Sequence, residues 1–178
     1  MSSLSLNNKQ AIDRILDANI NRLKEGLRVC EEICRFILDD RGLTGELKSA
    51  RHCIDLLAAR LNRGSRLISS RFTGEDVGRT VSASGEFSRG SCRDVFYANI
   101  QRVKESLRVL EEFSKLKDAR AAGGFKKARY RVYEIEKRAA LKLVVVRFDR
   151  QAGLRGPGYR ASGRRTQGRR RGPGPVKG

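Results

Sequence analysis

Charged and amide side chains recur at matched positions in two stretches of this chain. Residues 18–32 read ANINRLKEGLRVCEE, and residues 98–112 read ANIQRVKESLRVLEE. Apolar positions change between the copies, as at Leu23 and Val103, whereas most polar positions are identical. Exposed charges are usually the freer positions, so this pattern points to a role for the polar side chains. The identical polar pairs are Asn19 and Asn99, Arg22 and Arg102, Glu25 and Glu105, Arg28 and Arg108, Glu32 and Glu112, and, further along each copy, Arg51 and Arg129.

A helical wheel divides the first stretch into three faces. A stripe beside the core face carries Arg22, Glu25, Val29, Glu32 and Phe36, with Asn19 and Gly26 at its border. Its charged residues, together with Asn19, are called the polar stripe. The opposite side carries Lys24, Arg28, Glu31 and Arg35, which we expect to be exposed. The predicted core face consists of Ile20, Leu23, Leu27, Cys30, Ile33, Cys34 and Ile37.

Two interpretations of the repeated charges are open. Ion pairs between residues three or four positions apart on a helix contribute about 0.2–0.5 kcal/mol each and need no partner outside the helix. Such pairs would tolerate exchange for Lys or Asp. The same Arg and Glu at every matched position instead favours contacts that depend on geometry, such as bidentate binding of a carboxylate or phosphate.

Two hairpins related by a two-fold axis would bring both polar stripes toward one cleft. Glutamates that hold a metal ion and arginines that neutralise phosphate oxygens are the groups that a Mg²⁺–phosphate ligand requires. The expected Mg²⁺ ligands are Glu25, Glu32, Glu105 and Glu112, of which Glu32 and Glu112 are also the candidate catalytic residues. The expected phosphate-binding residues are Arg22, Arg51, Arg102 and Arg129.

A glycine-containing segment, TGEDVGRT at residues 73–80, could close over such a cleft. Gly78 would allow close backbone approach, Thr80 would donate a hydrogen bond, and Asp76 would act as a metal ligand or base. The segment is not a Walker A motif, since GxxxxGK[ST] is absent. An ordinary connector explains it equally well.

Periodicity and capping residues predict an all-α fold. Four helices are expected, at about 8–40, 44–61, 91–118 and 122–143. Gly42 is the expected stop of the first helix, Thr44 the N-cap of the second, and Ser91 with Asp94 a capping box for the third. LKSARH at 47–52 and FKKARY at 125–130 extend the repeat, so two duplicated hairpins should pack as a four-helix bundle-like domain with a long central loop. This domain covers 1–143, with halves at about 8–62 and 91–143 and a linker at 63–90.

The positive charge of the chain is unevenly distributed. The net charge is +19, and about half of the excess lies in a Gly-, Pro- and Arg-rich tail at 144–178 that we expect to be disordered. A basic RNA-binding tail and an out-of-frame read of the gene both explain it, and the sparse aromatics disfavour nucleic-acid binding.

No apolar run is long enough to span a membrane, and the first ten residues lack the layout of a secretory signal, which predicts a cytoplasmic protein.

The four cysteines are interpreted as structural. Cys30 and Cys34 stand one helical turn apart and His52 adjoins Cys53, which is compatible with a metal site. The second copy has Leu110 and Ser114 at the first two positions. We therefore expect buried, reduced cysteines and no zinc.

Several of these segments together resemble one known family. RILDANINRLKEGLRVCEEICRFILDD, LKSARH, EDVGRT and RDVFYANIQRVKESLRVLEEF are similar to the second, non-homologous type of hydroxymethylpyrimidine phosphate kinase. This is a helical domain often fused N-terminal to thiamine phosphate synthase (thiamine-phosphate pyrophosphorylase). The resemblance extends over about residues 8–143.

The resemblance implies a function in thiamine biosynthesis: phosphorylation of hydroxymethylpyrimidine phosphate to the diphosphate, with ATP as co-substrate and Mg²⁺. Asn19 or Asn99 would then read the pyrimidine edge. Thiamine phosphate synthase and a second copy of the chain are the other partners considered. The tail is far too short for the roughly 200 residues of a synthase barrel, so we expect no synthase activity in this sequence. A non-catalytic module that docks on the synthase and a nucleic-acid binder are the alternatives.

Overall fold

Four helices account for most of the chain. In the computed structural model, which describes residues 3–62, 67–71, 74 and 89–144, α1 covers Ser3–Phe36, α2 Arg41–Leu61, α3 Cys92–Ser114 and α4 Ala119–Leu143. A short 3₁₀ helix, η1, covers Leu67–Ser70. No strand occurs within these ranges, so the predicted all-α fold is confirmed. No helix in the described part of the chain is long and apolar enough to cross a membrane.

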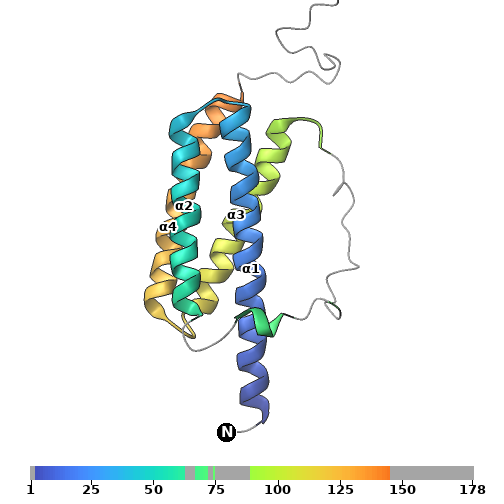
Figure 1. The fold of residues 1–178 in the computed structure, drawn as a ribbon, viewed down its shortest axis with the longest axis vertical. Helices are drawn as coiled ribbons and strands as arrows, with labels where there is room; N and C mark the ends of the chain where they lie inside the picture. The colour runs from blue at the N-terminus through green and yellow to red at the C-terminus, as the bar shows by residue number, and fades with distance from the viewer. Residues whose placement is uncertain (1–2, 63–66, 72–73, 75–88, 145–178) are drawn as a thin grey trace, which may run out of the picture.

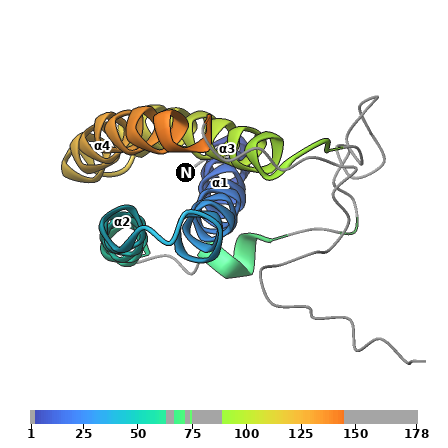
Figure 2. The ribbon, with the colours of Figure 1, turned by 90° about the horizontal axis from the view of Figure 1, so that it is seen from above.

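The helices form a ring of neighbours. α1 packs on α2 and α3, and α4 packs on α3 and α2, so each hairpin lies against the other (Figures 1 and 2). The first turns of α1 project beyond the end of the bundle, and η1 lies beside α1 (Figure 1). Large apolar side chains from all four helices fill the centre, among them Leu23, Leu27, Ile54, Phe96 and Phe125. The predicted core face of α1 is buried, except that Ile37 is only partly buried.

Close packing fixes the register of α1 against α3. A Cβ added at Gly26 would lie 2.8 Å from Cγ2 of Val103 and 3.0 Å from the carbonyl oxygen of Asn99. Further along α1, the Cys30 thiol donates to the carbonyl oxygen of Phe96 at 3.8 Å. Later residues of α1 thus face earlier residues of α3, so the two repeated helices run antiparallel across the bundle.

The end of the first helix differs from the prediction. α1 ends at Phe36, and Asp39 has φ 47°, in the left-handed region that Asp tolerates better than most residues. Gly42 is not the stop, because it lies in the first turn of α2. The N-cap of α2 is Asp40, whose side chain accepts from the Leu43 amide, whereas the Thr44 hydroxyl donates to the Asp40 carbonyl oxygen.

The second hairpin begins as predicted but turns earlier. Ser91 caps α3 and accepts from the Asp94 amide at 3.2 Å, while the Asp94 carboxylate accepts from the Gly90 amide rather than closing a full capping box. α3 ends at Ser114, and Asp118 caps α4 through the Arg120 and Ala121 amides. Asp118 therefore starts the fourth helix, not the Ala122 region.

Candidate functional site

A buried glutamate binds an arginine at the same position in each hairpin. Glu31 is 3% exposed and accepts from Nε of Arg51 at 2.7 Å, across α1 and α2. Glu111 is 5% exposed and accepts from Nε of Arg129 at 3.0 Å, across α3 and α4. The expectation that Glu31 faces solvent was wrong, because α2 covers that side of α1. The sequence did contain a signal for this buried contact: the Glu-Glu doublet at residues 31–32 is repeated at residues 111–112.

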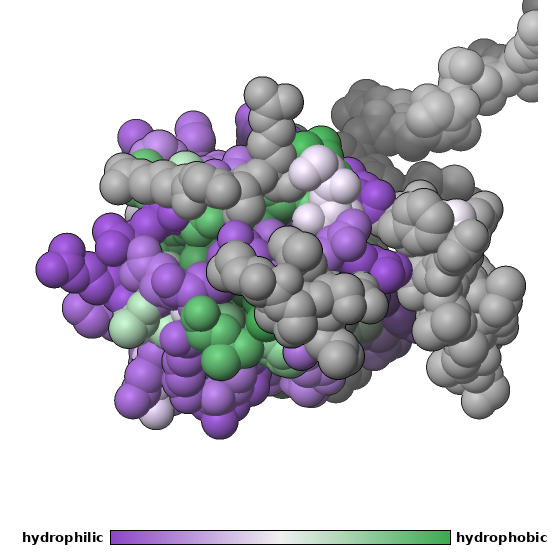
Figure 3. Space-filling view, turned by 90° about the horizontal axis from the view of Figure 1, so that it is seen from below, coloured by the Kyte–Doolittle hydropathy of each residue, from purple (hydrophilic) through white to green (hydrophobic). Residues whose placement is uncertain are grey.

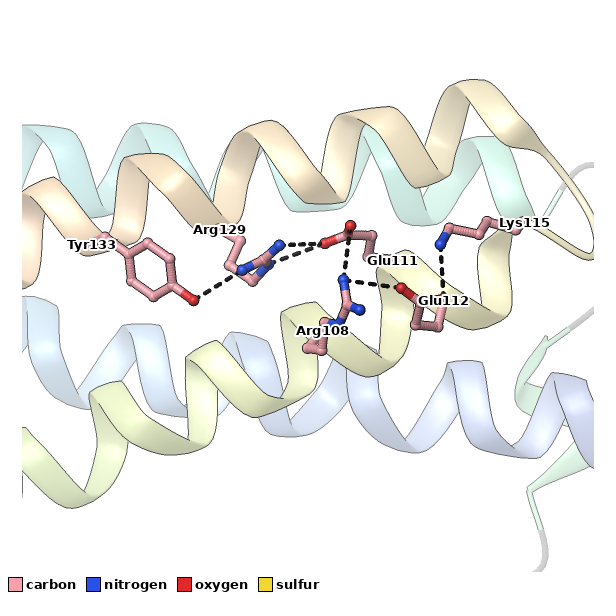
Figure 4. Close-up of polar contacts among 6 residues, drawn as sticks. All are labelled: Arg108, Glu111, Glu112, Lys115, Arg129 and Tyr133. Carbon is pink, nitrogen blue, oxygen red and sulfur yellow. Dashed lines mark hydrogen bonds and ion pairs between the residues drawn. The ribbon is translucent and has the colours of Figure 1, made fainter.

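A second arginine extends each pair toward the surface. Arg28 lies 3.3 Å from Glu31 and 2.8 Å from Glu32, and Arg108 lies 3.1 Å from Glu111 and 2.9 Å from Glu112. Figure 4 shows the second network, in which Arg129 also donates to the Tyr133 hydroxyl at 2.9 Å. Lys115 binds Glu112 and, with Arg108, holds the pKa of that carboxyl below its usual value. These contacts explain the matched Arg and Glu positions as two copies of one structural network.

The two networks do not form one cleft. Arg51 lies on the α1–α2 side of the ring and Arg129 on the α3–α4 side, which is opposite. The expected single cleft with all four arginines and four glutamates is therefore wrong. Within the described ranges, no three carboxylate, thiol or imidazole groups are placed to hold a metal ion together. The four glutamates do not fit one Mg²⁺ site, and the individual roles of Glu32, Glu105 and Glu112 stay predictions.

Part of the polar stripe of α1 instead lines a pocket of about 600 Å³. Three residues predicted for the site, Asn19, Arg22 and Glu25, border it. Ala11, Ile15 and Ala18 supply small or apolar side chains along the same face of α1. Sequence reasoning missed the remaining polar lining residues: Arg14, Asp17, Asn21 and Arg71.

An ion pair fastens η1 to the edge of this pocket. Arg71, directly after η1, binds Asp17 with two contacts, Nε to Oδ2 at 2.7 Å and Nη2 to Oδ1 at 3.0 Å. Leu67 of η1 is buried, and its amide donates to the side chain of Asn62 at 2.9 Å. The described lining of the pocket therefore comes from α1 and from Arg71, which follows the anchored η1.

The matched residues on α3 lie elsewhere. Among the described residues that line the pocket, none comes from α3, so Asn99, Arg102 and Glu105 are outside it. Asn19 and Asn99 share a structural feature, because each side-chain amide donates to the carbonyl oxygen four residues earlier, at 2.9 Å to Ile15 and 2.8 Å to Val95. The predictions for Asp76, Gly78 and Thr80, and for the tail at 144–178 beyond Val144, concern residues outside the described ranges.

A second, less polar hollow lies where α1 meets the α3–α4 turn. It has a volume of about 500 Å³ and is lined by Asn8, Lys9, Ile12, Leu116 and Lys117. Seen from this end of the bundle, the surface is mainly hydrophilic with a smaller hydrophobic area (Figure 3). Lys117 also binds Asp13 of α1. Among the described residues that line this hollow, lysine is the only charged type, and there is no cluster of arginines like that of the first pocket.

One protein family and several known proteins are similar in sequence to this chain. The model of the ThiD2 family matches residues 14–138. The thiamine-phosphate synthase of Synechocystis sp. is 44% identical over 132 residues, which cover 71% of this chain and 35% of that protein. The enzyme of the same name from Rhodopirellula baltica is 43% identical over 130 residues, covering 73% of this chain and 34% of that protein.

A further relative named thiamine-phosphate synthase, from Thermosynechococcus vestitus, is 38% identical over 146 residues, or 82% of this chain and 40% of that protein. The chain thus spans little more than a third of the length of these relatives. No solved structure matches it.

Proposed function

This chain belongs to the ThiD2 family, and on that premise we propose that it acts in thiamine biosynthesis as a kinase that converts hydroxymethylpyrimidine phosphate to the diphosphate. The observation that carries this proposal is the family match at 14–138, which includes most of the four-helix bundle and every described residue that lines the pocket on α1 except Ala11. The names of the relatives support the same pathway.

The pocket on α1 is the proposed substrate site. Among the described residues that line it, the arginines Arg14, Arg22 and Arg71 outnumber the acids Asp17 and Glu25, which favours an anionic ligand. The stripe of Ala11, Ile15 and Ala18 offers an apolar surface for a flat ring. Asn21 supplies an amide at the same face for the polar edge of a pyrimidine.

Phosphoryl transfer makes modest demands on such a site. A phosphomonoester loses its second proton near pH 6, so the acceptor oxygen is already a nucleophile at neutral pH. That oxygen attacks the γ-phosphorus of ATP, the bond to the bridging oxygen breaks, and ADP leaves with the electron pair. Mg²⁺ enters with ATP and neutralises charge on its phosphates. The protein has to align two anions, for which the arginines of the pocket are suited.

Glu25 is the one predicted Mg²⁺ ligand that borders this pocket. Its proposed role is to bind the Mg²⁺ of the nucleotide, directly or through water. Asp76 is proposed to orient the acceptor oxygen from the linker. Arg51 and Arg129 are already engaged by buried glutamates, so their proposed contacts with phosphate would compete with those pairs.

The direct test is an assay with the purified full chain, hydroxymethylpyrimidine phosphate and Mg-ATP. We expect ADP and the pyrimidine diphosphate to form in equal amounts, as followed by anion-exchange chromatography. Folded protein, checked by circular dichroism, that forms neither product above the enzyme-free rate would refute the kinase.

A second candidate function is a non-catalytic module that docks on a thiamine-phosphate synthase. It is favoured by the relatives, which carry that name and are much longer than this chain. Mixing the chain with a purified synthase distinguishes the two. A complex in sedimentation velocity without any pyrimidine phosphorylation would support the module and contradict the kinase.

A further inference from the structure

We infer that Arg71 binds the phosphate group of the pyrimidine substrate, and that Asp17 is the positioning residue that fixes the Arg71 guanidinium at the pocket. The inference rests on the proposed function in taking this pocket as the substrate site. The ligand class is a small phosphomonoester that carries a flat ring.

The ion pair with Asp17 uses only one edge of the guanidinium. Asp17 engages Nε and Nη2 of Arg71 in a side-on arrangement, at 2.7 and 3.0 Å. An arginine has five N–H groups in one plane, so two on Nη1 and one on Nη2 are left by this contact. Nη1 and Nη2 together form the end-on fork, which matches two oxygens of a second oxyanion. Arg71 can therefore bind Asp17 and a phosphate at the same time.

Burial makes Asp17 suited to positioning. Its side chain is 12% exposed, whereas that of Arg71 is 42% exposed and borders the pocket. A carboxylate held at the base of the pair restricts the long arginine side chain before any ligand arrives. Less rotamer freedom is then lost on binding, which strengthens the interaction. The anchoring of η1 through Leu67 and Asn62 restricts the backbone of Arg71 in the same way.

Within the described residues, the second half of the repeat replaces two of the pocket's charged groups. The position matching Asp17 is Tyr97, and the position matching Arg14 is Asp94, whose carboxylate accepts from the Gly90 amide. In the described part of the chain, the duplication therefore produced two structural networks, whereas the Asp17–Arg71 arrangement occurs in the first half alone. We expect one substrate molecule per chain.

Arg71→Lys is the sharpest variant, because lysine keeps the charge and can still reach Asp17 but has no fork. The Michaelis constant for hydroxymethylpyrimidine phosphate should rise by about tenfold or more, the cost of one charge-assisted hydrogen bond, while that for ATP stays within about twofold. Asp17→Asn should shift the same constant in the same direction. A merely structural role would instead lower the melting temperature and leave the Michaelis constant unchanged.

Calorimetric titration separates this inference from the kinase activity. Hydroxymethylpyrimidine phosphate is titrated without ATP into the wild type, Arg71→Lys and Arg35→Lys, an exposed control at the far end of α1. Tight binding to the wild type and control, with a loss of about tenfold in Arg71→Lys, supports the inference even in a chain without kinase activity. Binding equal in all three, or none to the wild type, would overturn it, whatever the kinase assay shows.

Discussion

The carboxylate of Glu31 lies 2.7 Å from Nε of Arg51, so a buried ion pair joins α1 to α2. Glu111 and Arg129 repeat this contact between α3 and α4. Removing one partner of a buried pair leaves the other charge without compensation, which is costly. The arginines are partly exposed, at 24% and 14%, so water offsets part of that cost.

Glu31→Gln and Glu111→Gln should each lower the free energy of unfolding by about 1–3 kcal/mol, measured by urea denaturation. The two pairs share no residue and lie in different hairpins, so the double variant should lose the sum within about 0.5 kcal/mol. Glu105→Gln, on the exposed side of α3, is the control and should change stability by less than about 0.5 kcal/mol. Equal effects of all three variants would mean that the pairs contribute nothing specific.

Gly26 is required by the close contact of α1 and α3. In Gly26→Ala the new methyl group would meet Val103 at 2.8 Å, which should cost about 1–3 kcal/mol in the free energy of unfolding. In Gly123→Ala on α4, the new methyl group would meet no described atom of another element within 4 Å. This variant should instead stabilise the fold by about 0.5–1 kcal/mol, because alanine favours the helix. Opposite signs in thermal or urea unfolding are the expected result. Stabilisation by both would show that the helices can separate at no cost.

Stability should fall at acid pH through Asp40. The hydrogen bond from Lys142, with that from the Leu43 amide, lowers the pKa of Asp40 below its value in an unfolded chain. Its contribution is therefore present above the unfolded pKa of about 4 and is lost as the pH falls through the lower folded value. Asp40→Asn keeps a capping side chain but cannot titrate. Its melting temperature should drop less between pH 6 and pH 3 than that of the wild type, and an equal drop would contradict this origin.

The cysteines should react in two classes. Burial is the main cause that raises the pKa of Cys34 to about 12 and that of Cys30 still further, so the thiolate is scarce at both. Cys53 and Cys92 are partly exposed. In the native protein, iodoacetamide at pH 8 should label the latter pair at least about tenfold faster, as read by mass spectrometry of peptides. Labelling of Cys30 as fast as Cys92 would indicate that the α1–α3 contact opens readily.

The helices could be predicted from the sequence because each has a clear helical period and a long apolar face. The ends of the helices were less predictable, since several residues that can cap a helix stand close together. The backbone geometry makes Asp40 rather than Thr44 the N-cap of α2, and it starts α4 at Asp118 rather than in the Ala122 region. Ser91 had no competitor and was predicted correctly.

The candidate site was predictable only in part. A helical wheel placed Arg22 and Glu25 together correctly, because both belong to one helix. It could not show that α2 covers Glu31, nor that the arginines of the two hairpins lie on opposite sides. Arg71 was not predicted as a site residue because it belongs to the linker, where no periodicity relates it to Asp17.

The central claim is that the α1 pocket binds the pyrimidine phosphate that the chain phosphorylates. The most direct measurement is the Michaelis constant for hydroxymethylpyrimidine phosphate in Arg22→Ala, compared with Arg35→Ala on the same helix. Arg22 borders the pocket, whereas Arg35 is exposed beside Phe36 and outside it. We predict a rise of about tenfold or more for Arg22→Ala and a change within about twofold for Arg35→Ala, with both proteins folded. An Arg22→Ala enzyme with the wild-type Michaelis constant would contradict the account.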